Sequence, residues 1–238
     1  MTIFEKVTDT PFLQTIQCID EKWVTSLFSL VNLNKGQILF HQGEPANTMC
    51  IVKSGELMKS FESETRSFVL SRHYSGDVIG EAEVLHWRRK RFVTTTAQQA
   101  TSIWQIDHER LDKLLTKYPT LYKHLFGVIG ERFVRAGRKI RYLAFMDARM
   151  RVVQLLVDYV SDHLQSHPSA PVPEWRVTQQ ELADLLGLNR ESIARVISEL
   201  QSHEVLVARR GVLQIADLQR LTEMASTLPA DIFASESV

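Results

Sequence analysis

The chain has few cysteines and no long apolar run. Its 238 residues include only two cysteines, Cys18 and Cys50, which lie far apart and form no Cys-x-x-Cys motif. Two cysteines exclude a disulfide framework and indicate a reducing compartment, and an iron–sulfur cluster would need about four ligands. No segment approaches the roughly 20 consecutive apolar residues of a membrane span. Because residues 1–10 also lack the apolar core of a signal peptide, we expect a cytoplasmic protein.

The chain also has no excess of positive charge. Its 28 basic residues equal its 28 acidic residues, and from Asp147 onward eight arginines and no lysine stand against thirteen acids, a net charge of −5. DNA-binding domains are usually basic. Any non-specific binding of DNA by this half of the chain should therefore be weak. Residues 190–211 carry four arginines and three glutamates, a net charge of +1. Any recognition of a specific DNA sequence would therefore depend on a few contacts with bases.

Enzyme motifs are missing as well. The chain contains no Gly-x-Ser-x-Gly, P-loop or Rossmann glycine pattern, so we predict no catalytic residue, no resident metal and no enzyme. It has no His-x-His motif, although a metal triad could assemble in space from His41, Glu44, His73 or His86. A β-roll metal-dependent enzyme is therefore one alternative. A regulator that senses redox state through the two cysteines or a haem is another.

Residues 178–200, T-Q-Q-E-L-A-D-L-L-G-L-N-R-E-S-I-A-R-V-I-S-E-L, predict two short helices around a tight turn. Thr178 is a good N-cap, and Glu181 completes a capping box. Gly187 ends the first helix as a C-cap glycine would, and Asn189 caps the second. This arrangement is typical of a helix-turn-helix, whose second helix enters the DNA major groove.

The second helix has one apolar and one polar face. Its apolar stripe has the spacing i, i+3, i+4, i+7 and consists of Ile193, Val196, Ile197 and Leu200. Arg190, Glu191 and Arg195 remain free for a partner. Arginine can bind guanine O6 and N7, and glutamate can accept from cytosine N4. We therefore predict that these three residues read bases.

The following segment predicts a wing. Two β-type runs, residues 205–208 and 212–215, flank Arg209-Arg210-Gly211, a short hairpin signature. Arg209 and Arg210 would lie where phosphates pass, together with Thr178 and Gln180 at the start of the helix-turn-helix. The domain is thus expected to be a winged helix-turn-helix.

The first half predicts short antiparallel strands. The β-type runs are residues 33–40, 50–53, 56–61 and 67–74, and glycine-containing turns separate them. Short strands of this kind indicate an antiparallel barrel or jelly roll. We predict an α+β chain with an N-terminal antiparallel β-roll, a long dimerisation helix and a C-terminal winged helix-turn-helix.

A long helix begins near Pro119 and carries two apolar stripes. One recurs at alternating spacings of four and three, typical of a parallel coiled-coil dimer, and consists of Tyr122, Phe126, Ile129, Phe133, Ala136, Ile140 and Leu143. The second, Leu121, Leu125 and Val128, should pack against the roll. A two-fold dimer would place two recognition helices about 34 Å apart and predicts a palindromic operator. Three glycines in this helix cost about 1 kcal/mol each relative to alanine; close approach of a partner helix or an effector would explain Gly127, Gly130 and Gly137.

These patterns divide the chain into four segments. Residues 1–117 form the predicted sensor roll, and residues 118–146 form the dimerisation helix and hinge. Residues 147–225 form the winged domain, with a polar loop at residues 163–173. Residues 226–238 form an expected flexible tail.

The landmarks N-L-N-K-G-Q-I-L-F-H-Q-G-E, I-V-K-S-G-E-L and G-D-V-I-G-E, together with R-E-S-I-A-R at residues 190–195, resemble the Crp/Fnr family of bacterial transcription regulators from about residue 20 to 220. The resemblance implies that the β-roll is a sensor domain like the jelly roll of cyclic-nucleotide-binding domains. It also implies an effector-controlled dimer that binds double-stranded DNA. In the Crp branch, Arg-Glu-x-x-x-Arg opens the recognition helix, which implies a palindromic operator with TGTGA half-sites. RNA polymerase is a further candidate partner.

The resemblance also places an effector pocket at Gly80, Glu81 and Arg91. In cyclic-nucleotide members, the glutamate accepts from a ribose hydroxyl and the arginine pairs with the cyclic phosphate. Here Phe92 replaces a phosphate-binding serine, and Glu83 replaces a small residue where a carboxylate would repel phosphate. On the long helix, Ala136 and Gly137 replace the Thr-Ser pair that reads adenine. The chain is therefore expected to use a small-molecule effector other than cyclic AMP, whose identity the sequence does not give.

Next to this pocket lies the basic run Arg88-Arg89-Lys90-Arg91, preceded by Trp87. A solvated hairpin tip is one interpretation of this run. Contact with an anionic effector or with RNA polymerase is the other.

Overall fold

The computed structural model describes residues 4–62, 67–166, 172 and 174–226. The chain divides into two compact units, Met1–Val134 and Arg135–Val238. The predicted tail lies outside the described residues except for Ser226, as do most residues of the loop predicted at 163–173. No helix in the described ranges is long and apolar enough to cross a membrane.

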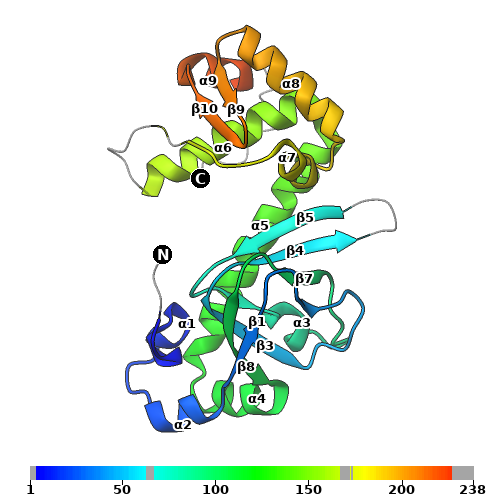
Figure 1. The fold of residues 1–238 in the computed structure, drawn as a ribbon. Coiled ribbons are helices and arrows are strands. Elements are labelled where there is room, and N and C mark those ends of the chain that lie inside the picture. Colours follow the sequence, from blue (N-terminus) through cyan, green and yellow to red (C-terminus); the bar gives the residue numbers. More distant parts are fainter. Residues whose placement is uncertain (1–3, 63–66, 167–171, 173, 227–238) are drawn as a thin grey trace. The chain divides into compact units, whose positions relative to one another are not determined.

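The first unit is a β-roll of two four-stranded antiparallel sheets (Figure 1). One sheet has the order β1-β8-β3-β6 and the other β2-β7-β4-β5. Their bounds are β1 Ser29–Leu33, β2 Ile38–Phe40, β3 Thr48–Ser54, β4 Leu57–Glu62, β5 Ser67–His73, β6 Val78–Ile79, β7 Thr94–Ala97 and β8 Thr101–Asp107. The predicted roll is thus confirmed.

The strand boundaries differ from the prediction in one region. Residues 33–40 are not one strand, because a turn separates β1 from β2: the amide of Gln37 donates to the carbonyl of Asn34 over 3.0 Å, and Gly36 has a φ of +82°. The sequence analysis also missed β6, β7 and β8. Strand β8 nevertheless pairs with both β1 and β3. Polar residues lie between and beside its buried apolar ones, Ile103, Trp104 and Ile106, whose burial does not follow a simple alternation.

Short helices close one end of the roll. They are η1 Val7–Asp9, α1 Pro11–Gln14, α2 Glu21–Ser26, α3 Glu81–Leu85 and α4 His108–Lys117. Together with the start of α5 they cover a core that includes Phe12, Leu13, Met49, Ile51, Ile106, Leu111, Leu114, Leu121 and Leu125. The expectation that Leu121 and Leu125 pack against the roll is therefore confirmed, whereas Val128 is only partly buried.

Helix α5 spans Thr120–Phe145 and begins directly after Pro119. Beyond Leu125 it offers large apolar side chains to solvent: Phe126 is 70% exposed, Phe133 79% and Ile140 66%. A β-carbon at Gly127, Gly130 or Gly137 would meet nothing within 4 Å. Within the described chain these glycines are therefore not required by close packing.

The second unit is a small helical domain with a two-stranded wing. Its elements are α6 Ala148–Ser166, α7 Gln179–Leu186, α8 Arg190–Ser202, β9 Leu206–Arg209, β10 Val212–Ile215 and α9 Leu218–Ser226. Helix α6 continues to Ser166, so the expectation that a loop starts at His163 was wrong: His163 and Leu164 are partly buried and belong to the last turns of the helix. The core comprises Val152, Val153, Leu156, Leu182, Ala183, Ile193, Ile197, Leu200, Val205, Leu206, Leu213 and Leu221.

Candidate nucleic-acid interface and sensor site

Local caps fix the helix-turn-helix. The hydroxyl of Thr178 accepts from the amide of Glu181 over 3.1 Å, and the Glu181 carboxylate accepts from the amide of Thr178 over 2.7 Å. Gly187 adopts the left-handed conformation, with a φ of +64°, and ends α7. The side chain of Asn189 then accepts from the amide of Ser192 over 2.8 Å and starts α8. Each of these predicted caps is present.

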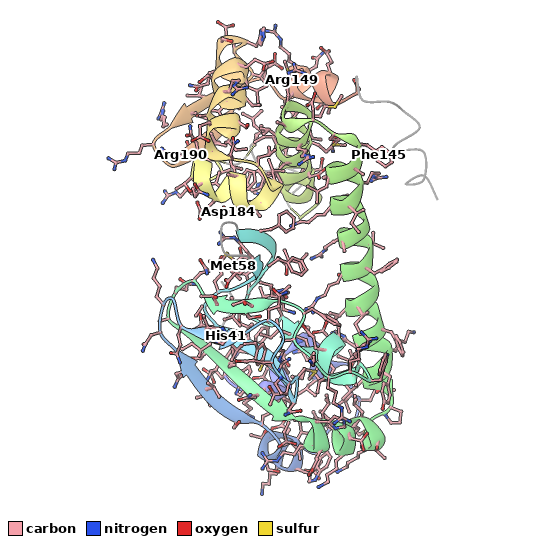
Figure 2. The ribbon with its side chains drawn as sticks, turned by 90° about the vertical axis from the view of Figure 1, so that its right-hand side faces the viewer. His41, Met58, Phe145, Arg149, Asp184 and Arg190 are labelled. Carbon is pink, nitrogen blue, oxygen red and sulfur yellow. The ribbon has the colours of Figure 1, made fainter. Side chains whose placement is uncertain are left out.

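Helix α8 presents the three predicted base readers to solvent. Ile193, Val196, Ile197 and Leu200 are buried, whereas Arg190, Glu191 and Arg195 are exposed. Arg190 lies at the junction of α7 and α8 (Figure 2). These three side chains form no hydrogen bond or ion pair with other described residues, so their charged groups remain available to a partner.

Two arginines of α6 contact neighbouring helices: Arg149 contacts α8, and Arg151 contacts the end of α5. Arg149 forms an ion pair with Glu199 of α8, with 2.6 Å between Nε and Oε1. Arg151 donates to the carbonyls of Leu143 (3.0 Å) and Met146 (2.9 Å). These contacts fix the position of α8 and of the end of α5 within the second unit.

The wing is a tight hairpin with Arg210 and Gly211 at its turn, where Gly211 has a φ of +73°. Arg209 and Arg210 are both exposed. Trp175 extends the wing through two hydrogen bonds of 2.8 Å with Leu213 and stacks on Tyr159, with ring centroids 4.3 Å apart. The wing thus holds two arginines on a braced hairpin. Of the predicted phosphate contacts outside the wing, Thr178 and Gln180 are exposed, but both side chains bond to carboxylates, Glu181 and Asp184.

In the first unit, the sensor site begins with a left-handed glycine. Gly80 has a φ of +80° and directs the chain into α3. Glu81, the next residue, is fully buried, and its carboxylate pairs with Arg132 of α5. Arg132 also donates to the carbonyl of Val78. The sequence analysis missed Arg132, because its contact spans 51 residues of sequence.

Arg91, the predicted phosphate partner, is buried, and of its guanidinium nitrogens Nε and Nη1 have no hydrogen-bond partner among the described residues. Its Nη2 donates to the carbonyl of Thr48 over 2.8 Å and to the Thr48 hydroxyl over 2.9 Å. Its guanidinium carbon lies 3.4 Å from the ring centroid of Phe40. A β-carbon at Gly80 would lie 2.6 Å from Nη1 of Arg91 and 3.0 Å from the carbonyl oxygen of Thr48, and the φ of +80° also disfavours a side chain, so the position favours glycine. Gly80, Glu81 and Arg91 thus lie together, as the spacing predicted.

A second buried ion pair lies beside this group. Lys59 of β4 and Glu83 of α3 are paired, with 3.8 Å between Nζ and Oε1, and their side chains are 8% and 5% exposed. Burial lowers the pKa of Lys59, while Glu83 and then Glu81 oppose this effect. Sequence reasoning singled out Glu83 but missed Lys59. The available signal was the period of two in β4, which places Lys59 on the same face as buried Leu57.

The other predicted effector residues lie elsewhere. Phe92 is 48% exposed, and its ring packs edge-on to His86, with centroids 5.8 Å apart. Ala136 and Gly137 lie on α5 after the unit boundary at residue 134, so they belong to the second unit. Their roles remain predictions.

Of the basic run, Arg88, Arg89 and Lys90 are exposed, whereas Arg91 is buried, so only the first three residues form the expected solvated tip. Trp87 is 78% exposed, and the guanidinium of Arg88 lies 4.6 Å from its ring centroid. Arg89 has a φ of +43°, a strained conformation for a residue with a side chain. Its carbonyl accepts from the amide of Ala46 over 2.8 Å. This backbone hydrogen bond therefore holds the turn at Arg89 in place.

The groups considered for metal or redox chemistry are placed as follows. No cluster of three or more His, Cys, Asp or Glu side chains in the described residues could hold a metal ion. Cys18 is exposed and Cys50 is buried. Burial raises the pKa of the Cys50 thiol to about 12, although Arg91 and Lys59 oppose it. Because the thiolate is the reactive form, Cys50 is unreactive at neutral pH.

A sensor-type β-roll followed by a winged helix-turn-helix defines the class of DNA-binding transcription regulators. Residues 30–118 match the family model of the cyclic nucleotide-binding domain, and residues 150–224 match that of the Crp-like helix-turn-helix domain. The CRP-like protein Clp of Xanthomonas euvesicatoria pv. vesicatoria is 32% identical over 178 residues, which cover 72% of this chain and 76% of Clp. The chain therefore belongs to the Crp/Fnr family of transcription regulators.

Two solved structures of similar proteins have the same fold as this chain. The structure of the cyclic-di-GMP-responsive global regulator CLP of Xanthomonas campestris superposes with a TM-score of 0.70 and 28% identity, covering 82% of this chain and 97% of CLP. A mutant of CooA from Carboxydothermus hydrogenoformans gives a TM-score of 0.75 at 22% identity, covering 92% of this chain and 97% of CooA. The CooA match supports the α+β fold alone.

Proposed function

We propose that this regulator binds, as a homodimer, a palindromic operator with TGTGA-type half-sites. The observation that carries the proposal is the face of α8, where Arg190, Glu191 and Arg195 are exposed and unpaired above a fully packed apolar stripe. Two arginines that flank a glutamate match the donor and acceptor pattern of guanine and cytosine edges in the major groove. Arg209, Arg210, Thr178 and Gln180 would contact the backbone.

The exposed stripe of α5 supports the dimer. Phe126, Phe133 and Ile140 lie one heptad apart and are each at least two thirds exposed. Water-exposed phenylalanines in such a row are unfavourable in a monomer. A second copy of α5 would bury them in a parallel seam with Tyr122, Ile129, Ala136 and Leu143.

Control of the regulator is proposed to come from an effector other than cyclic AMP. Ala136 and Gly137 stand where the resemblance places the Thr-Ser pair that reads adenine, and neither carries a side-chain hydrogen-bonding group. The effector would shift the population of two arrangements of the winged domains. The proposed hinge is residues 143–147, which include Met146 and Asp147 between α5 and α6.

The test is a titration of the full chain against a TGTGA-N6-TCACA duplex at fixed salt. The titration is run without ligand, with cyclic AMP, and with cyclic di-GMP, the ligand named for the Xanthomonas CLP. We expect binding tighter than to a scrambled duplex by at least about a hundredfold, within the usual range of specificity ratios, and no change on adding cyclic AMP.

Equal affinity for the two duplexes would overturn the proposed operator. In that case, selection from random DNA would identify the sequence that α8 reads. A gain in affinity with cyclic AMP would instead overturn the proposal about the effector and leave the operator intact.

A further inference from the structure

The interior of the roll holds charged groups where a ligand-binding domain needs space. Lys59, Glu81, Glu83 and Arg91 are all buried, and Arg132 reaches them from α5. Charges removed from water are costly unless other charges offset them. Here the offset comes from the chain itself, because Lys59 pairs with Glu83 and Arg132 pairs with Glu81.

Glu83 supplies an internal anion to the arginine of this site. Burial lowers the pKa of Arg91, and among the neighbouring charges Glu83 opposes this most strongly. The carboxylate of Glu83, held beside the site by Lys59, therefore favours the charged guanidinium without a hydrogen bond to it: Nε and Nη1 of Arg91 and Oε2 of Glu83 have no hydrogen-bond partner among the described residues. Thr48, Phe40 and Gly80 enclose the same guanidinium.

A cyclic phosphate beside Arg91 would bring a second negative charge next to a buried carboxylate. Glu83 cannot turn out to solvent without leaving Lys59 buried and unpaired, and an unpaired buried cation is strongly unfavourable. Lys59 in turn fills the inward position of β4, where a small apolar side chain would leave room for a ligand. The charge of Glu83 and the volume of Lys59 therefore both oppose the binding of a cyclic phosphate.

We propose that the Lys59–Glu83 ion pair closes this roll to cyclic nucleotides of every kind, so that Lys59 and Glu83 are its specificity-determining residues. This inference deepens the proposed function, since it concerns control of the same regulator. Its test measures nucleotide binding without DNA, so failure of the proposed operator would not affect it.

The experiment is isothermal titration of the full-length protein with cyclic AMP, cyclic GMP and cyclic di-GMP. The natural chain should show no binding up to about 1 mM of each ligand. The double variant Lys59→Val with Glu83→Ala removes the carboxylate and opens space beside Arg91. It should bind at least one of these nucleotides with a dissociation constant at least about tenfold below that limit.

A matched control removes a different ion pair of the same roll. Glu56, which directly precedes β4, pairs with Arg72 near the end of β5. The variant Glu56→Ala with Arg72→Ala should stay as inert toward nucleotides as the natural chain. Thermal unfolding and circular dichroism of each variant show whether the roll remains folded.

If truncation unfolds the roll, Lys59→Met with Glu83→Gln tests the same proposal, because this pair keeps the volume and removes both charges. This variant should bind at least one of these nucleotides with a dissociation constant at least about threefold below 1 mM. Binding of any cyclic nucleotide by the natural chain in the micromolar range would overturn the proposal. A folded variant pair that gains no affinity would overturn it equally, because some other feature would then exclude the ligand.

Discussion

Arg195 has the most specific role assigned to a single residue of this chain. It lies on the exposed face of α8, three residues after the N-terminal turn, and no other described residue neutralises its charge. Arg195→Ala should weaken operator binding by about 1–3 kcal/mol, the usual value of a bidentate arginine–guanine contact. Competition titrations with operator duplexes carrying each base at every half-site position measure this loss and show which position loses its preference.

Arg210→Ala is the matched control, because it removes the same charge at the tip of the wing. Its effect should be similar for operator and scrambled DNA, since a phosphate contact carries no base information. A loss below about 0.5 kcal/mol for Arg195→Ala would contradict its proposed role.

His73 makes the stability of the roll depend on pH. Burial lowers its pKa, although its hydrogen bond with Asp77 opposes this, and Lys59 and Arg132 add to the lowering. The folded state therefore favours neutral imidazole. Below about pH 6.5 the unfolded chain takes up a proton that the folded chain does not, so stability should fall as the pH falls. The contribution of this one group cannot exceed about 1.4 kcal/mol per pH unit.

Urea unfolding of the roll between pH 5 and 7.5 measures this dependence. His73→Asn should reduce the slope, because the amide does not titrate and its nitrogen can take the place of Nδ1 of His73, which lies 3.5 Å from the carboxylate of Asp77. His41→Asn removes an exposed histidine of the same unit and serves as the control. An unchanged slope in His73→Asn would show that another group is responsible.

At the scale of secondary structure, the exposed stripe of α5 carries the prediction about assembly. Phe133 is 79% exposed, so a change there should leave the fold of one protomer intact. Phe133→Asp should convert the dimer into a monomer, because two carboxylates would face each other in the seam. Sedimentation velocity measures the change.

Val134 provides the control for this variant. It is also exposed, at 59%, but lies outside the predicted heptad positions, so Val134→Asp should remain dimeric. The same sedimentation coefficient for the Phe133 and Val134 variants would remove the proposed seam.

Elements with local signals could be predicted from the sequence, whereas those fixed by distant contacts could not. The helix-turn-helix is defined within one stretch by Thr178, Gly187 and Asn189, and each cap appears where expected. Strand β8 is fixed by pairing with β1 and β3, about 70 and 50 residues away in sequence. The sensor site shows the same limit. Glu81 and Arg91 follow from spacing within one segment, whereas Lys59 and Arg132 meet them only through the fold.

At the scale of the whole molecule, a two-fold dimer fixes the distance between the two recognition helices. That distance should be one turn of DNA, about 34 Å, which a six-base spacer between TGTGA half-sites provides. Inserting five base pairs would place the half-sites on opposite faces of the duplex. We expect the affinity to fall to about that of a single half-site.

Gel-shift titration with duplexes of both spacer lengths measures this loss. A spacer of unchanged length but altered sequence is the control and should bind as the parent operator does. Equal affinity for the five-base-pair insertion would contradict a dimer that grips both half-sites at once.

The Lys59–Glu83 pair has an evolutionary consequence. Both residues lie in the first unit, whereas Arg190, Glu191 and Arg195 lie in the second. Two substitutions in the roll would separate a lineage that answers to a cyclic nucleotide from one that does not, with no change in the operators either lineage recognises. Descendants of one regulator could thus retain a set of target genes while changing the physiological signal that governs them.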